Sequence, residues 1–499
     1  MQSHGNSSRT VLSNTLYVDK IDEVYVQIIT EDSIAQELCD YFTFAVPGHE
    51  FMPSFRKKIW DGKIRLFSIQ NRKLYYGLVP YLLTFSEKYN YGIELACSID
   101  RIVKFDDEKG DEFIQSLQLP LEVRDYQLEG IRHALVRRRC LLVSPTASGK
   151  SLIIYLFIRF IIKEIEGNIL IVVPTTSLVE QLYKDFVDYG FESEKFIHRI
   201  YSGREKNTDK RITISTWQSL FKEKKQFFET YSAVIGDEAH LFKAKSLTSI
   251  MTKLVNAKYR IGTTGTLDGT QTHQLVLEGL FGKVKQITTT KQLIDSDILA
   301  FLEIHCIVLR HPISYSEDVL RFDYHRELDY LVSCNERNQF ITDMTSSLNG
   351  NTLVLFQLVE KHGEVLYTMM KDQLDKNVVF IHGGVETDVR EVIRETAEKI
   401  NDLVIVASYG TYSTGINIKN LHNIVFASPS KSPIRVLQSI GRGLRKGVDK
   451  NEVKLFDISD DLSIGSHSNY TYRHLLERLK IYNDEDFTYK IKKFNLEYL

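Results

Sequence analysis

Two short segments carry residues that together suit the hydrolysis of a nucleoside triphosphate. The first, Ser144 to Ser151, reads SPTASGKS and stands between an apolar strand and an apolar helical run. In that context a tight loop aims backbone N–H groups at phosphates, Lys150 supplies a cation and the Ser151 hydroxyl can bind magnesium. We therefore expect ATP and Mg²⁺ as cofactors. The expected nucleotide contacts in this loop are Thr146, Ala147, Ser148, Gly149, Lys150 and Ser151.

The second segment, Asp237 to His240, reads DEAH and ends another apolar strand. We expect Asp237 to hold the same magnesium ion and Glu238 to polarise the attacking water as general base. His240 either couples the nucleotide site to a second α/β domain or caps the loop. An acidic helix cap followed by a buried histidine would explain DEAH alone. It would not explain the presence of both segments in this order.

Short apolar strands alternate with helical patterns in two stretches, which is typical of parallel α/β domains. The first stretch spans about 120–285 and the second about 335–460. Strands are predicted at 140–145, 169–174, 211–217, 233–238 and 259–266, and then at 352–356, 377–383, 403–408, 423–428 and 454–459. These strands are rich in β-branched residues, as strands buried on both faces are.

The chain of 499 residues is too long for one ordinary core, so we expect several domains. A small α+β domain is predicted over 1–112, with the acidic segment 105–112 as a linker. The two α/β domains are predicted over 113–300 and 301–463. Residues 464–499 are expected to form a helical tail with a short ending.

The whole-chain charge gives no attraction to a polyanion, because the formal net charge is only −2. Any nucleic-acid contact must therefore come from locally basic surfaces. The five cysteines are scattered and form no CxxC pair, which argues against a disulfide framework or a zinc site. The N-terminal sequence has no apolar signal core, and we expect a cytoplasmic protein with no membrane contact.

DEAH, together with several other segments, resembles the motifs of helicase superfamily 2, in which two RecA-like lobes clamp ATP. RDYQ at 124–127 resembles the adenine-recognition element, with Gln127 and Arg124 as expected contacts. QSIGRGLRK at 438–446 matches QxxGRxxR, and this match implies that Gln438 contacts the nucleotide. Positions three apart share a helix face, so we expect the catalytic arginines Arg442 and Arg445 to point together at the γ-phosphate.

Other segments resemble the superfamily motifs that hold the nucleic-acid backbone. PTTSLVEQ, STWQSL and TTGTL follow successive strands of the first lobe, and ASYGTYSTGINIKNLH lies in the second. Small hydroxyls and backbone amides at such places suit phosphate oxygens, which carry no sequence information. Ordinary turn chemistry is the alternative for each loop alone. The expected nucleic-acid contacts are Pro174, Thr175, Thr176, Thr216, Trp217, Gln218, Thr414 and Asn417, and Gly415 is expected at the nucleotide.

A basic, aromatic run, FRKKIWDGKIRLF, stands in the N-terminal domain. Its cations suit phosphates, and Phe55 and Trp60 could stack on unpaired bases. A solvated hairpin with a buried Trp60 is the alternative. The expected nucleic-acid contacts are Arg56, Lys57, Lys58, Trp60, Lys63 and Arg65.

The same run is similar to the N-terminal domain of phage UvsW-type helicases, and the likeness continues through PTASGKS, DFVDYG, STGINIKNLH and IGRGLRK. This resemblance implies a DNA-dependent ATPase that remodels forks, Holliday junctions and R-loops in the host cytoplasm. We expect 3′ to 5′ movement and a monomer or weak oligomer, and the sequence does not identify the protein partners.

Two other functions remain open. The first is a double-stranded DNA translocase subunit of a restriction or repair assembly, which would use the same motor without strand separation. The sequence shows no arrangement of nuclease residues, which argues against it. An RNA helicase is the other alternative, although DEAH-box RNA enzymes normally carry further C-terminal domains.

Overall fold

The computed structural model describes residues 14–99, 104–201, 203–243, 245–267, 270–415, 418–428, 432–447 and 450–497. These residues form two compact units. One contains the described residues up to Val143 together with Gly149–Ile287, and the other contains Ser144–Ser148 and the described residues from Thr288 onward. Within the described residues, no helix is long and apolar enough to cross a membrane.

The N-terminal domain is a small α+β domain, as expected. Its five-stranded sheet has the order β5-β6-β2-β1-β7. Alternate residues such as Leu16, Val18, Val26 and Ile28 pack beneath helices in one core. The sheet consists of β1 (Thr15–Lys20), β2 (Tyr25–Ile29), β5 (Phe67–Ser68), β6 (Lys73–Tyr75) and β7 (Gly92–Leu95), and the helices are α1 (Asp32–Tyr41), η2 (Tyr76–Leu78) and α3 (Val79–Tyr89).

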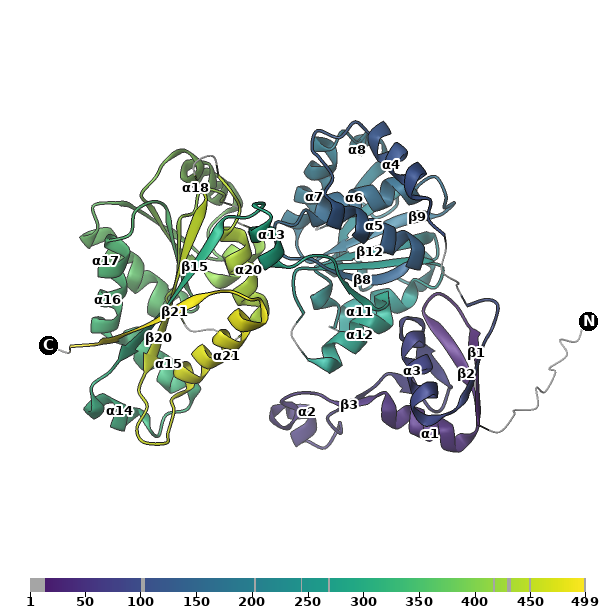
Figure 1. Ribbon diagram of the computed structural model, residues 1–499, viewed down its shortest axis with the longest axis horizontal. Coiled ribbons are helices and arrows are strands. Elements are labelled where there is room, and N and C mark those ends of the chain that lie inside the picture. Colours follow the sequence, from purple (N-terminus) through teal and green to yellow (C-terminus); the bar gives the residue numbers. More distant parts are fainter. Residues whose placement is uncertain are drawn as a thin grey trace, which may run out of the picture. The chain divides into compact units, whose positions relative to one another are not determined.

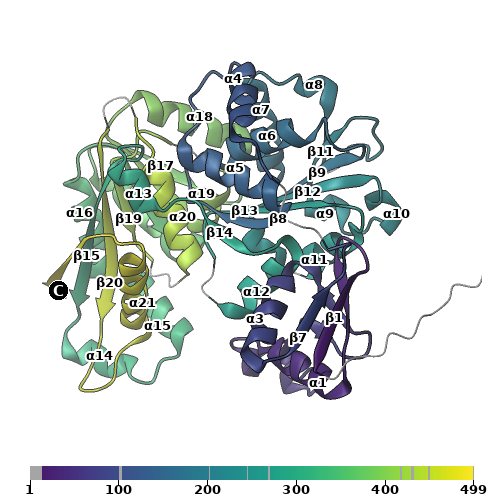
Figure 2. The same ribbon diagram turned by 45° about the vertical axis from the view of Figure 1, so that its right-hand side comes forward.

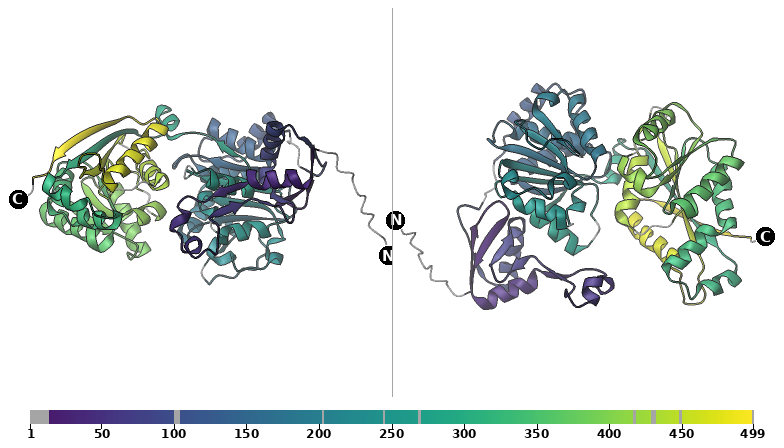
Figure 3. Two further views of the ribbon diagram at one scale, coloured as in Figure 1. Left: turned by 90° about the horizontal axis from the view of Figure 1, so that it is seen from below. Right: turned by 180° about the vertical axis from the view of Figure 1, so that it is seen from behind.

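An arm, residues 43–65, projects from this domain (Figures 1 and 3). Its base is a two-stranded antiparallel ladder of β3 (Thr43–Ala45) and β4 (Lys63–Arg65). Its tip holds η1 (His49–Phe51) and α2 (Pro53–Arg56). The basic, aromatic run of the sequence therefore extends from the tip of the arm back through its base.

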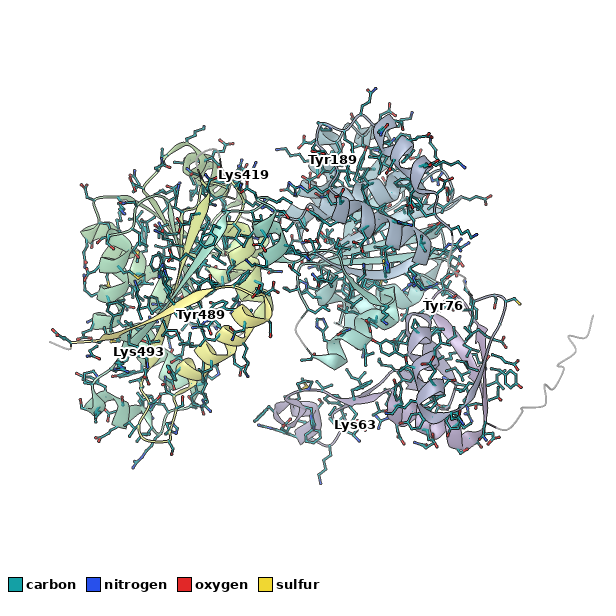
Figure 4. The ribbon with its side chains drawn as sticks, viewed as in Figure 1. Lys63, Tyr76, Tyr189, Lys419, Tyr489 and Lys493 are labelled. Atoms are coloured by element: carbon teal, nitrogen blue, oxygen red, sulfur yellow. The ribbon has the colours of Figure 1, made fainter. Side chains whose placement is uncertain are left out.

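The N-terminal domain is fixed to the first α/β lobe by buried polar contacts. The Arg139 guanidinium lies 3.9 Å from the centre of the Tyr76 ring and donates to the Glu23 carbonyl oxygen at 2.9 Å. The Tyr81 hydroxyl donates to the buried Glu278 carboxylate at 2.5 Å. A Cβ atom on Gly77 would lie 1.9 Å from the Glu278 carbonyl oxygen, so the backbones touch there. Figure 4 labels Tyr76 at this junction.

The first lobe is built on a seven-stranded sheet of order β10-β11-β9-β12-β13-β8-β14 in which the paired strands are parallel. Helices α5, α6 and α7 cover one face, and α11 and α12 cover the other (Figures 1 and 2). The strands are β8 (Arg139–Val143), β9 (Asn168–Val173), β10 (Ile197–Ile200), β11 (Ile212–Thr216), β12 (Tyr231–Asp237), β13 (Tyr259–Thr264) and β14 (Val284–Gln286).

The helices of the first lobe include one that replaces the predicted linker. The acidic segment is part of α4, which begins at Asp107 and is capped by the Asp106 carboxylate accepting from the Lys109 N–H. The helices are α4 (Asp107–Ser116), α5 (Asp125–Arg137), α6 (Lys150–Ile161), α7 (Thr176–Asp188), α8 (Ser193–Phe196), α9 (Trp217–Leu220), α10 (Lys225–Phe228), η3 (Ala239–Lys243), α11 (Lys245–Lys253) and α12 (Gln271–Phe281).

The second lobe has a seven-stranded parallel sheet of order β17-β18-β16-β19-β20-β15-β21. Both sheets confirm the predicted tandem α/β architecture. The end of the predicted helical tail differs, because β21 joins this sheet beside β15. The strands are β15 (Phe301–Arg310), β16 (Thr352–Phe356), β17 (Asn377–Ile381), β18 (Leu403–Ser408), β19 (Asn423–Phe426), β20 (Glu452–Asp461) and β21 (Tyr489–Asn495).

Helices cover both faces of this second sheet. In Figures 1 and 2, α16 and α17 lie on one side of it, and α20 and α21 lie on the other. The helices are α13 (Thr290–Asp295), α14 (Ile313–Val319), α15 (Tyr324–Ser333), α16 (Asn335–Ser346), η4 (Val359–Gly363), α17 (Glu364–Gln373), α18 (Thr387–Lys399), α19 (Tyr409–Gly415), α20 (Pro433–Gly443) and α21 (Tyr470–Asp484).

Helix α21 is held to β20 by an ion pair with no solvent exposure. The Arg478 Nε atom lies 3.0 and 2.8 Å from the two Asp457 carboxylate oxygens, and its Nη2 donates to Ser459 Oγ at 2.6 Å. We expect Arg478→Met to lower the free energy of unfolding by about 3–5 kcal/mol, because it leaves a buried carboxylate without its cation. Arg473→Met, at an exposed site on the same helix, is the control. Urea unfolding of the two variants measures the difference, and equal losses would show that the pair contributes no net stability.

Candidate nucleotide and nucleic-acid sites

The SPTASGKS loop connects β8 to α6 in a conformation that ordinary residues rarely adopt. Ala147 and Gly149 have φ angles of +70° and +82°. Gly149 is the N-cap of α6, so Lys150 and Ser151 begin the helix. The first position of the pattern carries Ser144 in place of glycine, and its buried hydroxyl donates to the Ser148 hydroxyl. The loop thus ends at the start of a helix, where the backbone geometry suits a phosphate.

The predicted adenine element lies against this loop. Gln127 is 3% exposed, and its Oε1 accepts from the Arg124 N–H at 3.0 Å at the start of α5. A Cβ atom on Gly149 would lie 2.4 Å from the Gln127 amide nitrogen, and the φ of +82° at this position favours glycine. The Arg124 side chain is exposed and donates to the Tyr126 hydroxyl at 3.1 Å.

The acidic pair lies where β12 ends. Burial raises the pKa of Asp237 and the neighbouring Glu238 raises it further, while Lys150 and a hydrogen bond from Thr263 at 2.7 Å lower it. The structure therefore brings Lys150 to the predicted magnesium ligand. Glu238 has a φ of +51°, and strained backbone of this kind occurs at functional sites. Within the described part of the chain, Glu238 Oε2 is buried and accepts no hydrogen bond.

His240 joins this acidic pair to the TTGT segment at the end of the neighbouring β13. Its Nδ1 lies 3.4 Å from Glu238 Oε2 and 3.0 Å from Thr264 Oγ1, and its carbonyl oxygen is 2.9 Å from His273 Nε2. Thr263 binds Asp237, as described above. From the sequence, TTGT was expected along the nucleic-acid track. Its hydrogen bonds place Thr263 on Asp237 and Thr264 on His240.

The expected magnesium ligand Ser151 has a partner that the sequence did not reveal. Its Oγ lies 2.9 Å from the Tyr189 hydroxyl. Tyr189, labelled in Figure 4, follows α7, and burial raises its pKa. Tyr189 lies in DFVDYG, a segment of the UvsW-type resemblance. That segment has no cation and no motif spacing that would indicate a phosphate site.

In the second lobe, the arrangement of the two arginines differs from the expectation. Helix α20 carries Gln438 and Arg442 but ends at Gly443, so Arg445 does not share its face. Arg445 instead forms an antiparallel bridge with Leu299. The two cations still converge on Tyr412: burial raises its pKa to about 12, and Arg442 and Arg445 act in the opposite direction. The Tyr412 hydroxyl is buried and has no hydrogen-bond partner among the described residues.

Two further predicted residues of this lobe lie at the end of α19. Thr414 and Gly415 are the last two residues of that helix. Asn417 lies outside the described residues.

The first-lobe residues predicted to contact nucleic acid gather at the carboxyl ends of adjacent β9 and β11. Thr175 caps α7 and accepts from the Leu178 N–H at 3.3 Å. Thr216 precedes Trp217 at the start of α9, and Gln218 donates to the Pro174 carbonyl oxygen at 3.3 Å. Thr176 begins α7.

A basic cavity that the sequence did not indicate lies beside these residues. Its volume is about 290 Å³, and its lining includes Arg204, Lys206 and Lys222 together with Gln218. Arg204 and Lys206 flank Glu205, and Lys222 is distant in the sequence, so no local charge run pointed to this cavity. Lys206 pairs with Glu223, and the three cations together give the cavity a surface suited to phosphates.

On the arm, the cations Arg56, Lys57, Lys58 and Lys63 are exposed, while Arg65 pairs with Asp61 at 2.5 Å. Figure 4 labels Lys63 there.

The apolar side chains of the arm are arranged differently from the expectation. The two aromatic residues expected to stack are both half-buried: the Trp60 indole donates to the Lys63 carbonyl oxygen at 2.9 Å, and Phe55 packs against His49. The most exposed apolar side chains are Phe51 at 72% and Ile59 at 77%. Sequence patterns do not distinguish such residues from core residues.

Three family models match the chain. They are described as DNA helicase UvsW, N-terminal, over residues 16–96; type III restriction enzyme, res subunit, over 120–269; and helicase conserved C-terminal domain over 336–447. The ATP-dependent DNA helicase uvsW of Enterobacteria phage T4 is 34% identical over 497 residues, covering 95% of this chain and 98% of that protein. The chain belongs to the UvsW helicase family.

The crystal structure of T4 UvsW agrees with this placement. It covers 97% of this chain and 100% of its own, with 33% identity and a TM-score of 0.53. A shorter match is the DNA 3′-5′ translocase XPB2 of Sulfurisphaera tokodaii, 31% identical over 164 residues, which are 32% of this chain and 35% of that protein. The UvsW N-terminal match includes the whole arm, so the arm belongs to the part that this family model describes.

Proposed function

We propose that this UvsW-family chain is an ATP-dependent DNA helicase that remodels branched DNA. The observation that carries the proposal is the near full-length similarity to the T4 DNA helicase, which spans both lobes and the N-terminal domain. The strained DEAH turn beside Lys150 supplies the ATPase chemistry. The cationic arm adds a surface that DNA translocation alone does not require.

The first lobe would bind ATP with the residues assembled at β8, β12 and α5. The N–H groups of Thr146, Ala147, Ser148 and Gly149 and the Lys150 cation would hold phosphates, and Gln127 with Arg124 would recognise adenine. Ser151 and Asp237 fit a magnesium ion, because the Asp237 carboxylate has lost solvent and stands beside a second carboxylate. A bound magnesium ion would neutralise phosphate charge.

Hydrolysis would depend on Glu238 and on residues of the second lobe. The Oε2 atom of Glu238, which lies 3.4 Å from His240 Nδ1 and has no hydrogen bond among the described residues, would take a proton from the attacking water. Arg442 and Arg445 would stabilise charge at the γ-phosphate, with Gln438 and Gly415 completing the nucleotide contacts. Because these groups come from two lobes, the rate of hydrolysis would depend on residues of both lobes.

DNA would be held by its backbone. Pro174, Thr175, Thr176, Thr216, Trp217, Gln218, Thr414 and Asn417 are the proposed contacts in the lobes. On the arm the proposed contacts are Arg56, Lys57, Lys58, Trp60, Lys63 and Arg65. Phosphate contacts of this kind give binding without sequence preference.

The proposed substrates are forks, Holliday junctions and R-loops, and the proposed setting is the cytoplasm of a bacterial host. Movement 3′ to 5′ is supported by the similarity of 164 residues to the archaeal DNA 3′-5′ translocase XPB2. We propose action as a monomer or weak oligomer.

The arm provides a direct test. We expect the triple variant Arg56→Ala/Lys57→Ala/Lys58→Ala to bind forked DNA about 10- to 100-fold more weakly and to lower the slope of log affinity against log salt by about 3, because each lost phosphate contact releases one counterion fewer. Fluorescence anisotropy at several salt concentrations measures both quantities. The control Lys371→Ala/Lys399→Ala/Lys480→Ala removes three exposed cations elsewhere.

The same two variants and the unaltered protein should be assayed for ATP hydrolysis and strand release on a fork, a four-way junction, plain duplex and an RNA duplex. The proposal expects ATP-dependent product from the branched DNAs, lost in the arm variant and kept in the control. Hydrolysis on plain duplex without strand release would instead identify a translocase. Preference for the RNA duplex would identify an RNA helicase.

A further inference from the structure

A buried lysine lies between the arginine-bearing helix α20 and strand β20. Lys450 is 2% exposed. Its ammonium group donates to three carbonyl oxygens: Lys419 at 2.8 Å, Gly443 at 2.5 Å and Arg445 at 2.8 Å. An ammonium group has three hydrogens, so the three acceptors use all of them.

The three acceptors belong to two separate segments. Gly443 is the last residue of α20, and Arg445 follows it, so both lie in QSIGRGLRK. Lys419 lies in the segment TGINIKNLH. The ammonium also lies at the carboxyl end of α20, where the helix dipole favours a cation.

The Lys419 end of this connection is firmly anchored. The Lys419 N–H donates to Glu398 Oε1 of α18 at 2.6 Å. The neighbouring Asn420 amide donates to the carbonyl oxygens of Ala397 and Ile400 at 3.1 and 3.2 Å. Lys450 therefore joins the end of α20 to a loop that is itself fixed to α18.

We propose that Lys450 is a positioning residue that fixes the backbone of Gly443 and Arg445, and so the arginines Arg442 and Arg445, against the Lys419 loop. The proposal rests on the proposed role of these arginines in ATP hydrolysis. Without the ammonium, three carbonyl oxygens lose their donor, and the chain that carries the arginines is free to shift. Misplacement of catalytic groups by about 1 Å reduces rates by about 100-fold.

The surroundings of Lys450 act on its pKa in opposite directions. Burial lowers the pKa of Lys450 to about 7, and Glu398 opposes this effect. His422, the other titratable group coupled to it, has a pKa lowered by burial and by Lys450.

The test compares Lys450→Met with Lys450→Arg and with the control Lys480→Met, whose exposed lysine is on α21. We expect Lys450→Met to lower kcat for DNA-stimulated ATP hydrolysis by about 10- to 100-fold, with KM for ATP and affinity for DNA within about twofold of the unaltered protein. Lys450→Arg, which keeps a cation with several donors, should give an intermediate kcat.

An unchanged kcat in Lys450→Met, or a parallel loss of ATP and DNA binding, would overturn the inference. If Lys450→Met melts below the assay temperature, Lys450→Gln replaces it and is interpreted in the same way. Absence of DNA-stimulated hydrolysis in the unaltered protein would contradict the proposed function and not the role of Lys450.

Discussion

Glu238→Gln is expected to reduce DNA-stimulated ATP hydrolysis by about 10²- to 10⁴-fold, because it removes the proposed general base while keeping the side-chain volume. The buried Oε2 atom of Glu238, without a hydrogen bond among the described residues, is placed for proton transfer. A glutamine amide cannot accept the proton. Binding of a fluorescent ATP analogue should change little, since Lys150 and the loop remain. Phosphate release under saturating DNA measures the effect.

The control is Glu229→Gln, an exposed glutamate in the same lobe. It should hydrolyse ATP at the unaltered rate. If Glu238→Gln keeps more than a tenth of the activity, Glu238 is not the general base, and Asp237 becomes the residue to test.

Arg442→Ala is expected to lower the hydrolysis rate by about 10³- to 10⁵-fold, the effect typical of a lost arginine finger. Arg442→Lys should also be impaired, because a lysine keeps the charge but loses the planar, forked donor geometry. Single-turnover hydrolysis with ATP affinity measured in parallel separates the chemical step from binding. Arg321→Ala, at an exposed site of the same lobe, provides the control.

A loss below about 10-fold in Arg442→Ala would contradict the finger assignment. The same measurement on Arg445→Ala then shows whether Arg445 is the essential arginine. Arg445 lies outside α20, so different parts of the backbone position the two arginines. One arginine can therefore be essential for hydrolysis when the other is not.

The strands of both lobes were predictable because each is a continuous apolar run buried on both faces. The missed strands β10 and β14 are short and carry polar residues at sheet edges, and β15 lies in the first part of its lobe, ahead of the predicted α/β pattern. Strand β21 was missed because its lysines and half-exposed apolar residues resemble a solvated ending. Its place in the sheet depends on β15, which is distant in sequence.

The nucleotide loop and the acidic pair were predictable since their spacing is local. The shared helix face of Arg442 and Arg445 was wrong, because α20 ends at Gly443, and Lys450 holds that end from outside the helix. Tyr189 and Tyr412 were missed for a similar reason. The Tyr189 hydroxyl contacts Ser151, and Arg442 and Arg445 act on the Tyr412 hydroxyl. These residues are distant in the sequence and come together only in the folded chain.

The firm seating of the N-terminal domain on the first lobe has a mechanical consequence. With Tyr76 against Arg139 and Tyr81 on the buried Glu278, the arm's domain is joined to the sheet that carries Glu238. The arm, Lys150 and Glu238 therefore belong to one compact unit. A force applied to the proposed DNA contacts of the arm would be transmitted directly to the lobe that carries these residues.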